Sequence, residues 1–294
     1  MLKLNQVKIE DELSFELINY TYKGDLKMKL KKLLGLALVG VISTSLFVGC
    51  SKSSGGDDKT IKVGASPTPH AEILEVAKPL LKEKGYELEL VEFDDYVLPN
   101  TSLAEGELDA NYFQHVPYLE EMNKEKDLKL TYTSKIHIEP MGIYSEKHDK
   151  LDDLKDGAKI SVPNDATNEA RALQLLAENG IIEVGDKELI TVKDITKNPK
   201  NIEIVEIDAA QVPSTLQDVD FAVINTNFAL NFNLNPTKDA LAIESSDSPY
   251  ANILACREDN KEDEKVKALT EALTSDEVKS FIEEKYKGSI VPTF

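Results

Sequence analysis

Segments with the two-residue period of a β-strand alternate with segments of helical period along residues 60–294, and this alternation restricts the fold more than any other feature. Residues 60–65 and 87–93 are predicted strands. Between them, apolar side chains recur at helical spacing, at Ile73, Val76, Ala77, Leu80 and Leu81. Gly85 is placed to end this helix. A strand–helix–strand start predicts a parallel sheet in an α/β fold.

A second alternating unit follows. Strands are predicted at 109–114, 159–164, 189–195, 202–207 and 221–225, with helices at 115–126, 168–179, 261–274 and 275–286. Gly180 is placed to end the helix at 168–179, and Asn100 is a predicted N-cap of a short helix. An extended segment at 246–255 brings the chain back before the two final helices.

This order predicts two lobes joined twice. The first lobe is expected from 60–137 plus 253–294 and the second from 138–252, with hinge crossovers near 135–145 and 246–254. Because ligands bind beyond the carboxyl ends of strands in α/β sheets, a cleft between the lobes is the expected site.

The N-terminal region has the pattern of a bacterial lipoprotein signal. Lys29, Lys31 and Lys32 follow Met28, and roughly 16 mostly apolar residues lead to Gly49 and Cys50, too few for a spanning helix of about 20. The pattern predicts a signal peptide at 28–49, lipid on Cys50 and a flexible tether at 50–59. An uncleaved anchor with an unmodified cysteine is the alternative.

Residues 1–27 do not fit a signal peptide, because five acidic side chains oppose a positive start. We interpret them as a mis-annotated extension and exclude them from the fold.

Charge restricts the partners. The residues after position 49 carry 27 basic and 48 acidic groups, a net charge of −21, which argues against nucleic acid and against a polybasic membrane contact. With Cys50 lipidated, Cys256 would be alone, and its apolar surroundings predict a buried, inert thiol. Only two arginines, Arg171 and Arg257, stand against 32 lysines, so arginine is expected where a planar bidentate donor is needed, although chance is the alternative.

Several strings resemble one known family. They are Tyr-Val-Leu-Pro-Asn from 96, Asp-Ala-Asn-Tyr-Phe-Gln-His from 109, Val-Pro-Asn-Asp-Ala-Thr-Asn-Glu-Ala-Arg from 162, Val-Ile-Asn-Thr from 223 and Ser-Pro-Tyr-Ala-Asn from 248. On these motifs the chain is similar to the NlpA/MetQ family of methionine-binding lipoproteins, the substrate-binding components of methionine ABC importers.

The resemblance implies a periplasmic-binding-protein-like α/β clamp, with two lobes that close on a free amino acid. It also implies a non-enzymatic receptor on the extracytoplasmic face of the cell membrane, held by lipid on Cys50. Its expected partners are L-methionine or a close analogue and the importer's permease and ATPase. No cofactor, metal or nucleic acid is expected, and the chain is expected to be a monomer. A Gly-Met dipeptide or D-methionine as the ligand, a surface interaction or adhesion lipoprotein, and a lipoprotein hydrolase remain alternatives.

The predicted site has a partner for each of the three parts of a free amino acid, which are the carboxylate, the ammonium and the side chain. Arg171 supplies a geometrically matched cation for the carboxylate, and Asn168 lies one turn away on the same helix face near an N-terminus that favours anions. A surface ion pair is the alternative for Arg171. The resemblance assigns the ammonium to Asn225 and Asn252, which spacing alone would place in turns.

The resemblance also places the ligand side chain among aromatic residues. A thioether packs well on such walls, and the predicted pocket consists of Tyr96, Phe113, His115 and Tyr118. Ordinary aromatic core is the alternative for Phe113 and Tyr118. A zinc ligand is the alternative for His115. However, the four histidines, His70, His115, His137 and His148, have no metal-ligand spacing to one another. Catalytic motifs, such as a nucleophile elbow or a phosphate loop, are absent from the sequence.

Overall fold

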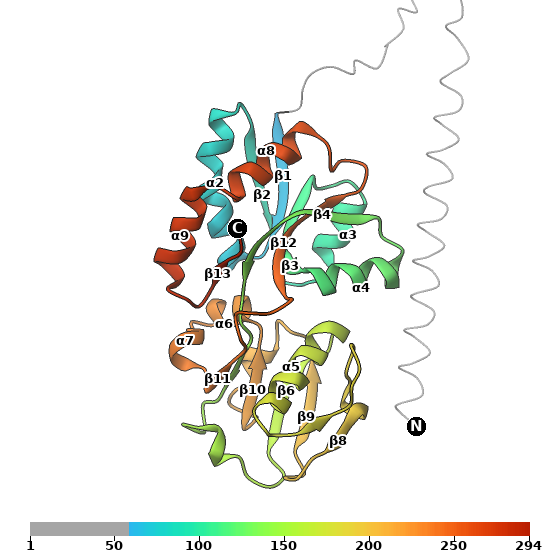
Figure 1. Ribbon diagram of the computed structural model, residues 1–294, viewed down its shortest axis with the longest axis vertical. Coiled ribbons are helices and arrows are strands. Elements are labelled where there is room, and N and C mark those ends of the chain that lie inside the picture. Colours follow the sequence, from blue (N-terminus) through green and yellow to red (C-terminus); the bar gives the residue numbers. More distant parts are fainter. Residues whose placement is uncertain (1–58) are drawn as a thin grey trace, which may run out of the picture. The chain divides into compact units, whose positions relative to one another are not determined.

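Residues 59–294, the part of the chain that the computed structural model describes, fold around two sheets that define two lobes (Figure 1). The predictions for the extension at 1–27, the signal peptide at 28–49, and Cys50 with its tether lie outside the described residues, apart from Lys59 at the end of the tether. Both sheets mix parallel and antiparallel pairs and are flanked by helices, which confirms the α/β, two-lobed class predicted from the alternating pattern.

The first lobe contains a six-stranded sheet in the order β13-β4-β12-β3-β1-β2. Its strands are β1 (Thr60–Ala65), β2 (Glu87–Glu92), β3 (Ala110–His115), β4 (Leu130–Ile138), β12 (Ala251–Arg257) and β13 (Val291–Pro292). β1 pairs in parallel with β2 and β3, as the strand–helix–strand start predicts, whereas β12 runs antiparallel to β3 and β4. The parallel pairing predicted from the start of the chain therefore holds for β1 to β3, and the returning half of this lobe is antiparallel.

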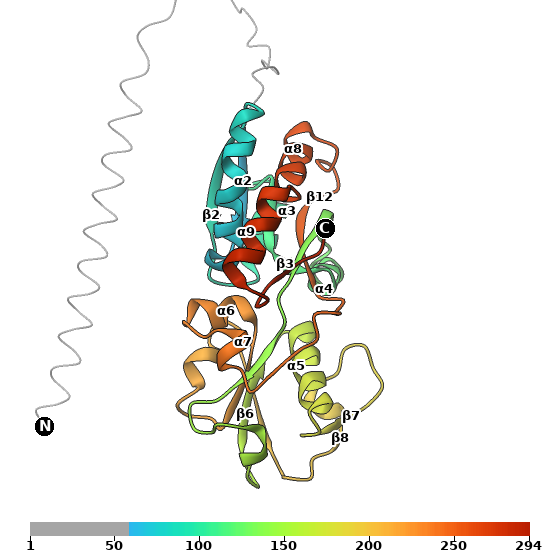
Figure 2. The ribbon, with the colours of Figure 1, turned by 60° about the vertical axis from the view of Figure 1, so that its left-hand side comes forward.

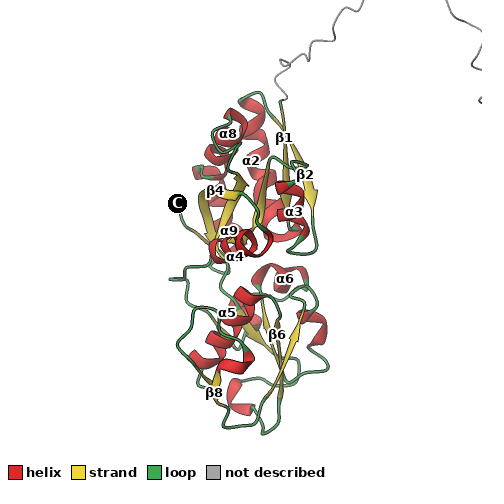
Figure 3. Ribbon diagram, turned by 90° about the vertical axis from the view of Figure 1, so that its right-hand side faces the viewer, coloured by secondary structure: helices red, strands yellow, loops and turns green. Residues whose placement is uncertain are grey.

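Five α-helices flank this sheet (Figure 3). They are α2 (Glu72–Glu83), α3 (Leu98–Ala104), α4 (Val116–Lys126), α8 (Glu264–Leu273) and α9 (Asp276–Tyr286), with one π-helical turn at Pro67–Ala71. Pro79 lies inside α2, which runs on to Glu83 and is followed by Gly85 at φ 83°. The apolar faces of α2, α8 and α9 meet in one core that includes Ile73, Leu81 and Ile282.

The second lobe has a five-stranded sheet in the order β11-β5-β10-β6-β9. The strands are β5 (Gly142–Tyr144), β6 (Lys159–Pro163), β9 (Glu203–Ile207), β10 (Phe221–Ile224) and β11 (Ala242–Ile243), and β7 (Glu183–Val184) with β8 (Ile195–Lys197) makes a separate hairpin. The helices are α5 (Ala166–Glu178), α6 (Thr226–Asn231) and α7 (Pro236–Asp239), and 3-10 turns lie at Leu151–Asp153, Val192–Asp194 and Val212–Thr215. α5 packs on the parallel strands through Leu173 and Leu176.

Two segments connect the sheets, one after β4 and one before β12 (Figure 2). The returning strand starts at Ala251, so Ala251 and Asn252 pair with β4 in the six-stranded sheet, earlier than the boundary at 253 that the pattern suggests. Asn252 therefore belongs to the sheet of the first lobe.

Two local predictions were wrong for identifiable reasons. Asn100 lies inside α3 rather than at its N-cap, because the carboxylate of Asp95 accepts hydrogen bonds from the backbone N–H groups of Val97 and Leu98 at the helix start. The Asn100 side chain is buried instead and donates to Gln114. The predicted strand at 189–195 is mostly the 3-10 turn Val192–Asp194, which a reciprocal Thr191–Asp194 capping box stabilises.

Cys256 is buried on β12 with a free thiol, and burial raises its pKa to about 11, which confirms the predicted buried thiol. Within residues 59–294, no helix combines the length and the apolar character that crossing a bilayer requires.

Gly142 on β5 has the ring of Tyr144 directly over its α-carbon. A β-carbon added at Gly142 would lie 2.7 Å from the Tyr144 ring, whereas one added at Gly185 would have 3.7 Å to its nearest neighbour. Because Tyr144 is almost fully buried and cannot easily move, Gly142→Ala is expected to lower the free energy of unfolding by about 1–3 kcal/mol. Urea denaturation measures this, with Gly185→Ala as the matched control; equal stability of the two variants would contradict the close packing.

Candidate functional site

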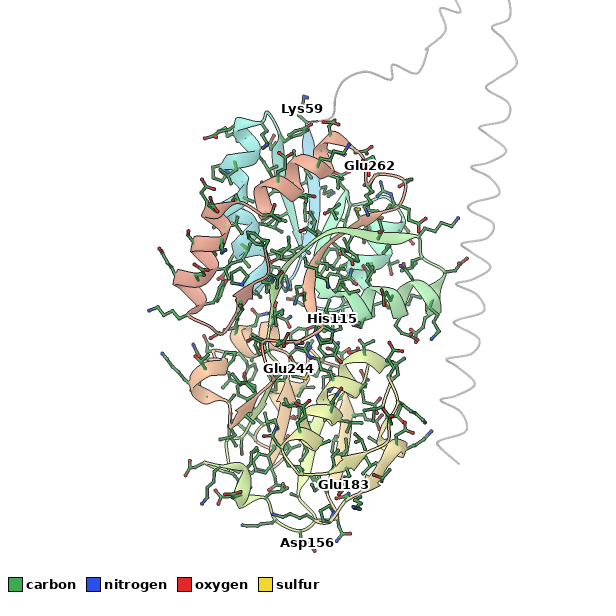
Figure 4. The ribbon with its side chains drawn as sticks, in the orientation of Figure 1. Lys59, His115, Asp156, Glu183, Glu244 and Glu262 are labelled. Carbon is green, nitrogen blue, oxygen red and sulfur yellow. The ribbon has the colours of Figure 1, made fainter. Side chains whose placement is uncertain are left out.

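A cavity lies between the two lobes, with about 330 Å³ of atom-free space when the part open to solvent is included. Figure 4 shows His115 and Glu244 near the junction of the lobes at this point. The lining side chains come from both lobes and from the first crossover (Tyr96, Phe113, Gln114, His115, Tyr118, Glu139, Asn168, Arg171, Asn225, Thr226, Asn227 and Asn252). All eight cleft residues predicted from the sequence are among them.

Arg171 projects from α5 into this cavity with 4% of its surface exposed. Its Nε and Nη2 donate to the Glu244 carboxylate, with Nη2 to Oε2 at 2.5 Å, and Nη2 also donates to the backbone oxygen of Glu139 at 2.7 Å. The Tyr250 ring covers the guanidinium, with the Arg171 Cζ 4.4 Å from its centroid. Nη1 has no hydrogen-bond partner among residues 59–294 and is left for a ligand.

A chain of side-chain hydrogen bonds fixes Asn225 at the end of β10. The carboxylate of Asp165, the N-cap of α5, accepts from Asn168 Nδ2, and Asn168 Oδ1 accepts from Asn225 Nδ2 at 2.8 Å. The amide nitrogen of Asn225 is thereby used, and its Oδ1 is buried with no partner in the described part of the chain. An unpaired buried acceptor costs free energy, so this oxygen favours a donor from a bound molecule.

Asn227 presents the opposite group. Tyr96 Oη donates to Asn227 Oδ1 at 2.6 Å, and the Asn227 Nδ2 is buried without a partner in the described residues. Sequence reasoning missed Asn227, although its position two residues after Asn225 in a polar stretch was a signal. The two amides therefore offer one acceptor and one donor to the same cavity.

Aromatic rings from the first lobe form another part of the cavity wall. Tyr96 and Phe113 have centroids 5.8 Å apart, Phe113 and Tyr118 6.1 Å apart, and Phe228 from α6 meets Tyr96 at 4.9 Å. The Tyr118 hydroxyl donates to the backbone oxygen of Tyr96. The wall is therefore apolar on its cavity side and fixed by polar contacts behind it.

His115 joins the two lobes and caps α4. Its Nδ1 accepts the backbone N–H of Tyr118, so the proton is assigned to Nε2, which lies 3.2 Å from Asn168 Oδ1. Burial, and then the Arg171 charge, lower the pKa of His115 from 6.5 to about 3. His115 is thus a neutral donor between the lobes.

His115→Gln is expected to make the fold less sensitive to acid. Because folding lowers this pKa, the histidine's full contribution is present above about pH 6.5 and is lost as the pH falls toward 3. The unfolding free energy of the wild type should fall relative to the variant by about 1.4 kcal/mol per pH unit between about pH 6 and 4. Urea unfolding at several pH values measures this difference; a difference that is constant with pH would contradict the assigned neutral state.

Asn252 lies on the cavity floor, but its oxygen has a partner. Asn252 Oδ1 lies 3.0 Å from His70 Nε2, so this oxygen already has one partner. Because an amide oxygen can accept a second hydrogen bond, the expectation that Asn252 offers it to an ammonium stays a prediction.

His70, His137 and Glu139 form a buried cluster. His137 and Glu139 are near neighbours in the sequence, whereas His70 comes from a distant segment. Three potential metal-ligand atoms of these side chains lie within 4.8 Å of one another. Both Nε2 atoms, however, contact the same oxygen, Glu139 Oε1, at 3.1 Å for His70 and 2.7 Å for His137. The hydrogen bond of His137 Nε2 goes to Glu139 Oε1, whereas that of His70 Nε2 goes to Asn252 Oδ1. The prediction that the protein has no metal site stays a prediction.

Comparison with known proteins agrees with the motifs. The sequence profile of the NlpA lipoprotein family matches residues 61–294. The methionine-binding lipoprotein MetQ of Bacillus subtilis is 43% identical over 272 residues, which cover 90% of this chain and 99% of that protein.

Two solved structures share the fold. A nutrient binding protein from Burkholderia cenocepacia, bound to methionine, is 48% identical with a TM-score of 0.78, covering 80% of this chain and 100% of that one. A periplasmic substrate-binding protein of an ABC transporter from Coxiella burnetii is 43% identical with a TM-score of 0.77, covering 79% and 100%. These matches span nearly all of the described residues and confirm the predicted family: the chain belongs to the NlpA lipoproteins.

Proposed function

We propose that this protein captures free methionine between its lobes and delivers it to an ABC importer. The observation that carries the proposal is the set of unpaired groups in the cavity: Asn225 Oδ1 as acceptor, Asn227 Nδ2 as donor and Arg171 Nη1 as cationic donor. An α-amino acid has the complementary groups, an ammonium that donates and a carboxylate that accepts. Each unpaired buried group would then gain a partner on binding.

The aromatic wall suits the side chain of methionine. A thioether is long, unbranched and polarisable, and it packs favourably on the rings of Tyr96, Phe113 and Tyr118. The relatives named for methionine support the same ligand.

Binding between lobes explains how capture is coupled to closure. Hydrogen bonds from Tyr96 to Asn227 and from His115 to Asn168 join the two lobes beside the ligand groups. A ligand held by both lobes stabilises the closed arrangement, because its contacts are complete only there. A permease would receive the closed, loaded protein, and lipid on Cys50 would keep the monomer on the extracytoplasmic face of the membrane.

The role is binding rather than catalysis. The neutral histidines, the oriented amides and the single arginine of the cavity each have an assignment as donor or acceptor, and none is an activated nucleophile paired with a base. The relatives that match are likewise described as binding proteins or lipoproteins.

The test is native mass spectrometry of protein purified without unfolding, followed by calorimetry. Retained mass equal to methionine, and tight binding of added L-methionine after unfolding and refolding, are expected. D-methionine and the dipeptide Gly-Met are the competing ligands, and tighter binding of either would reassign the substrate. No binding of all three by the refolded protein would contradict the receptor function.

A further inference from the structure

Arg171 lines the cavity as one half of an ion pair. The Glu244 carboxylate accepts hydrogen bonds from Arg171 Nε and Nη2, the latter at 2.5 Å. The two side chains are 4% and 12% exposed, and this is the one ion pair that Arg171 forms among residues 59–294. Because a guanidinium and an ionised carboxylate carry opposite unit charges, the pair as a whole is neutral.

Glu244 belongs to the same lobe as Arg171. It follows β11 directly, and its backbone N–H donates to the Met141 oxygen at 2.8 Å, which continues the pairing of β11 with β5. The backbone N–H of Met141 donates in turn to Glu244 Oε2 at 3.4 Å. Arg171 projects from α5 of this lobe. The pair is therefore built within one lobe and does not depend on closure of the lobes over a ligand.

The carboxyl group of Glu139, which also lines the cavity, does not take this place. Its Oε1 accepts from His137 Nε2, and the guanidinium of Arg171 contacts the backbone oxygen of Glu139 rather than its side chain. The Tyr250 ring covers one face of the guanidinium, with the Arg171 Cζ 4.4 Å from the ring centroid. Glu244 is therefore the group that directly balances the charge of Arg171.

A neutral pair discriminates between ligands by their net charge. A zwitterionic amino acid is neutral overall, so its carboxylate meets the guanidinium while its ammonium is attracted by the negative charge of the glutamate. A ligand with a carboxylate but no ammonium brings a second negative charge to the same guanidinium, and like charges repel strongly where water is excluded. Specificity often depends on such repulsion of the wrong ligand.

We propose that Glu244 is a positioning residue that sets the net charge of the ligand: it fixes the edge of the Arg171 guanidinium and offsets its charge, so that the cleft takes neutral amino acids and rejects simple carboxylate anions. Glu244 acts through the arginine, since it borders a separate pocket with Arg171 and Tyr250 and does not line the ligand cavity. This inference rests on the proposed function, because it assumes that the carboxylate of the ligand meets Arg171.

The experiment compares two ligands that differ only in the ammonium. L-Methionine is zwitterionic, and 4-(methylthio)butanoate is its anionic analogue without the amino group. Calorimetry gives both dissociation constants for the wild type, for Glu244→Gln, which keeps the shape but removes the charge, and for Glu244→Asp, which keeps the charge. In Glu244→Gln the preference for methionine over the analogue should fall roughly tenfold or more, because one charge–charge interaction across the site is removed. Glu244→Asp should retain most of the preference.

The matched control is Glu169→Gln. Glu169 is a buried carboxylate on the same helix that accepts the backbone N–H of Val192 and lines neither pocket, so this variant should keep the preference of the wild type.

The stability of Glu244→Gln supplies a second measurement. The substitution leaves a buried cation without its partner, so the variant is expected to unfold at lower urea concentration than the wild type. A ligand that binds the folded state raises the urea midpoint. The analogue supplies a negative charge to the bare guanidinium, and its effect on the midpoint relative to that of methionine should therefore be larger in the variant than in the wild type. This comparison also serves if the variant folds only with ligand present.

Two results would overturn the inference. If Glu244→Gln keeps the wild-type preference, whether or not both affinities fall, Glu244 supports the fold without setting the charge of the ligand. Equal preferences in Glu244→Asp and Glu244→Gln would have the same meaning. Failure of the proposed function is separate, because then the wild-type protein itself would not bind methionine.

Discussion

Replacement of Arg171 by alanine is expected to weaken methionine binding by about 3–5 kcal/mol, roughly a hundred- to several-thousand-fold. The guanidinium is buried and lines the cavity, and its Nη1 has no hydrogen-bond partner among residues 59–294. Without it, the ligand carboxylate would be shut in the cleft with amide donors alone. Isothermal titration calorimetry measures the loss. Arg171→Lys should fall between the two, because an ammonium keeps the charge but cannot bind Glu244, the Glu139 oxygen and a ligand from one planar fork.

The chain offers a matched control in its second arginine. Arg257 donates from Nη1 to the backbone oxygens of Leu103 and Leu108 and does not line the cavity. Arg257→Ala should therefore reduce stability but leave methionine affinity within about twofold. Because Arg171→Ala also leaves Glu244 unpaired, its folding is checked by urea denaturation. A folded Arg171→Ala within twofold of the wild type would contradict the assigned role.

The sequence was most informative where one segment contains a whole pattern. Strong local periodicity predicted α2, α5 and α9 and the buried strands β1, β6 and β10. It failed for β7, β13 and α7, which have only two to four residues each and are too short to show a period. The antiparallel pairing of β12 with β4 joins residues more than a hundred positions apart, which no local pattern encodes.

The residues of the candidate site likewise fall into two groups, those that a local sequence pattern predicts and those that depend on distant segments. Arg171 and Asn168 were predicted because one helix turn and the rarity of arginine mark them within the sequence. Glu139 and Asn227 were missed because their chemistry depends on what the crossovers bring beside them: two imidazoles for Glu139 and the Tyr96 hydroxyl for Asn227. The Asn252 amide was predicted as a site residue, but the direction in which it points depends on His70, 182 positions away in the sequence.

Phe113→Ala is expected to weaken methionine binding by about 1–3 kcal/mol, roughly 10- to 200-fold, while binding of glycine or alanine changes little. Phe113 lies at the end of β3, packed between Tyr96 and Tyr118, and its ring would contact the ligand's thioether rather than its charged end. The loss should therefore grow with the length of the ligand side chain. Calorimetry with methionine, alanine and glycine measures this series.

Truncation of a buried ring also leaves a cavity, which can cost about 3–5 kcal/mol of stability, so Phe113→Leu is the companion variant. Leucine keeps most of the apolar contact and should lose less affinity for methionine than alanine does. The control is Phe281→Ala, which removes a half-buried ring on α9 that does not line the cavity and should not alter the affinity. Equal losses for methionine and glycine in Phe113→Ala would mean that this ring supports the fold of the cleft as a whole, and the side-chain pocket would then have to lie elsewhere.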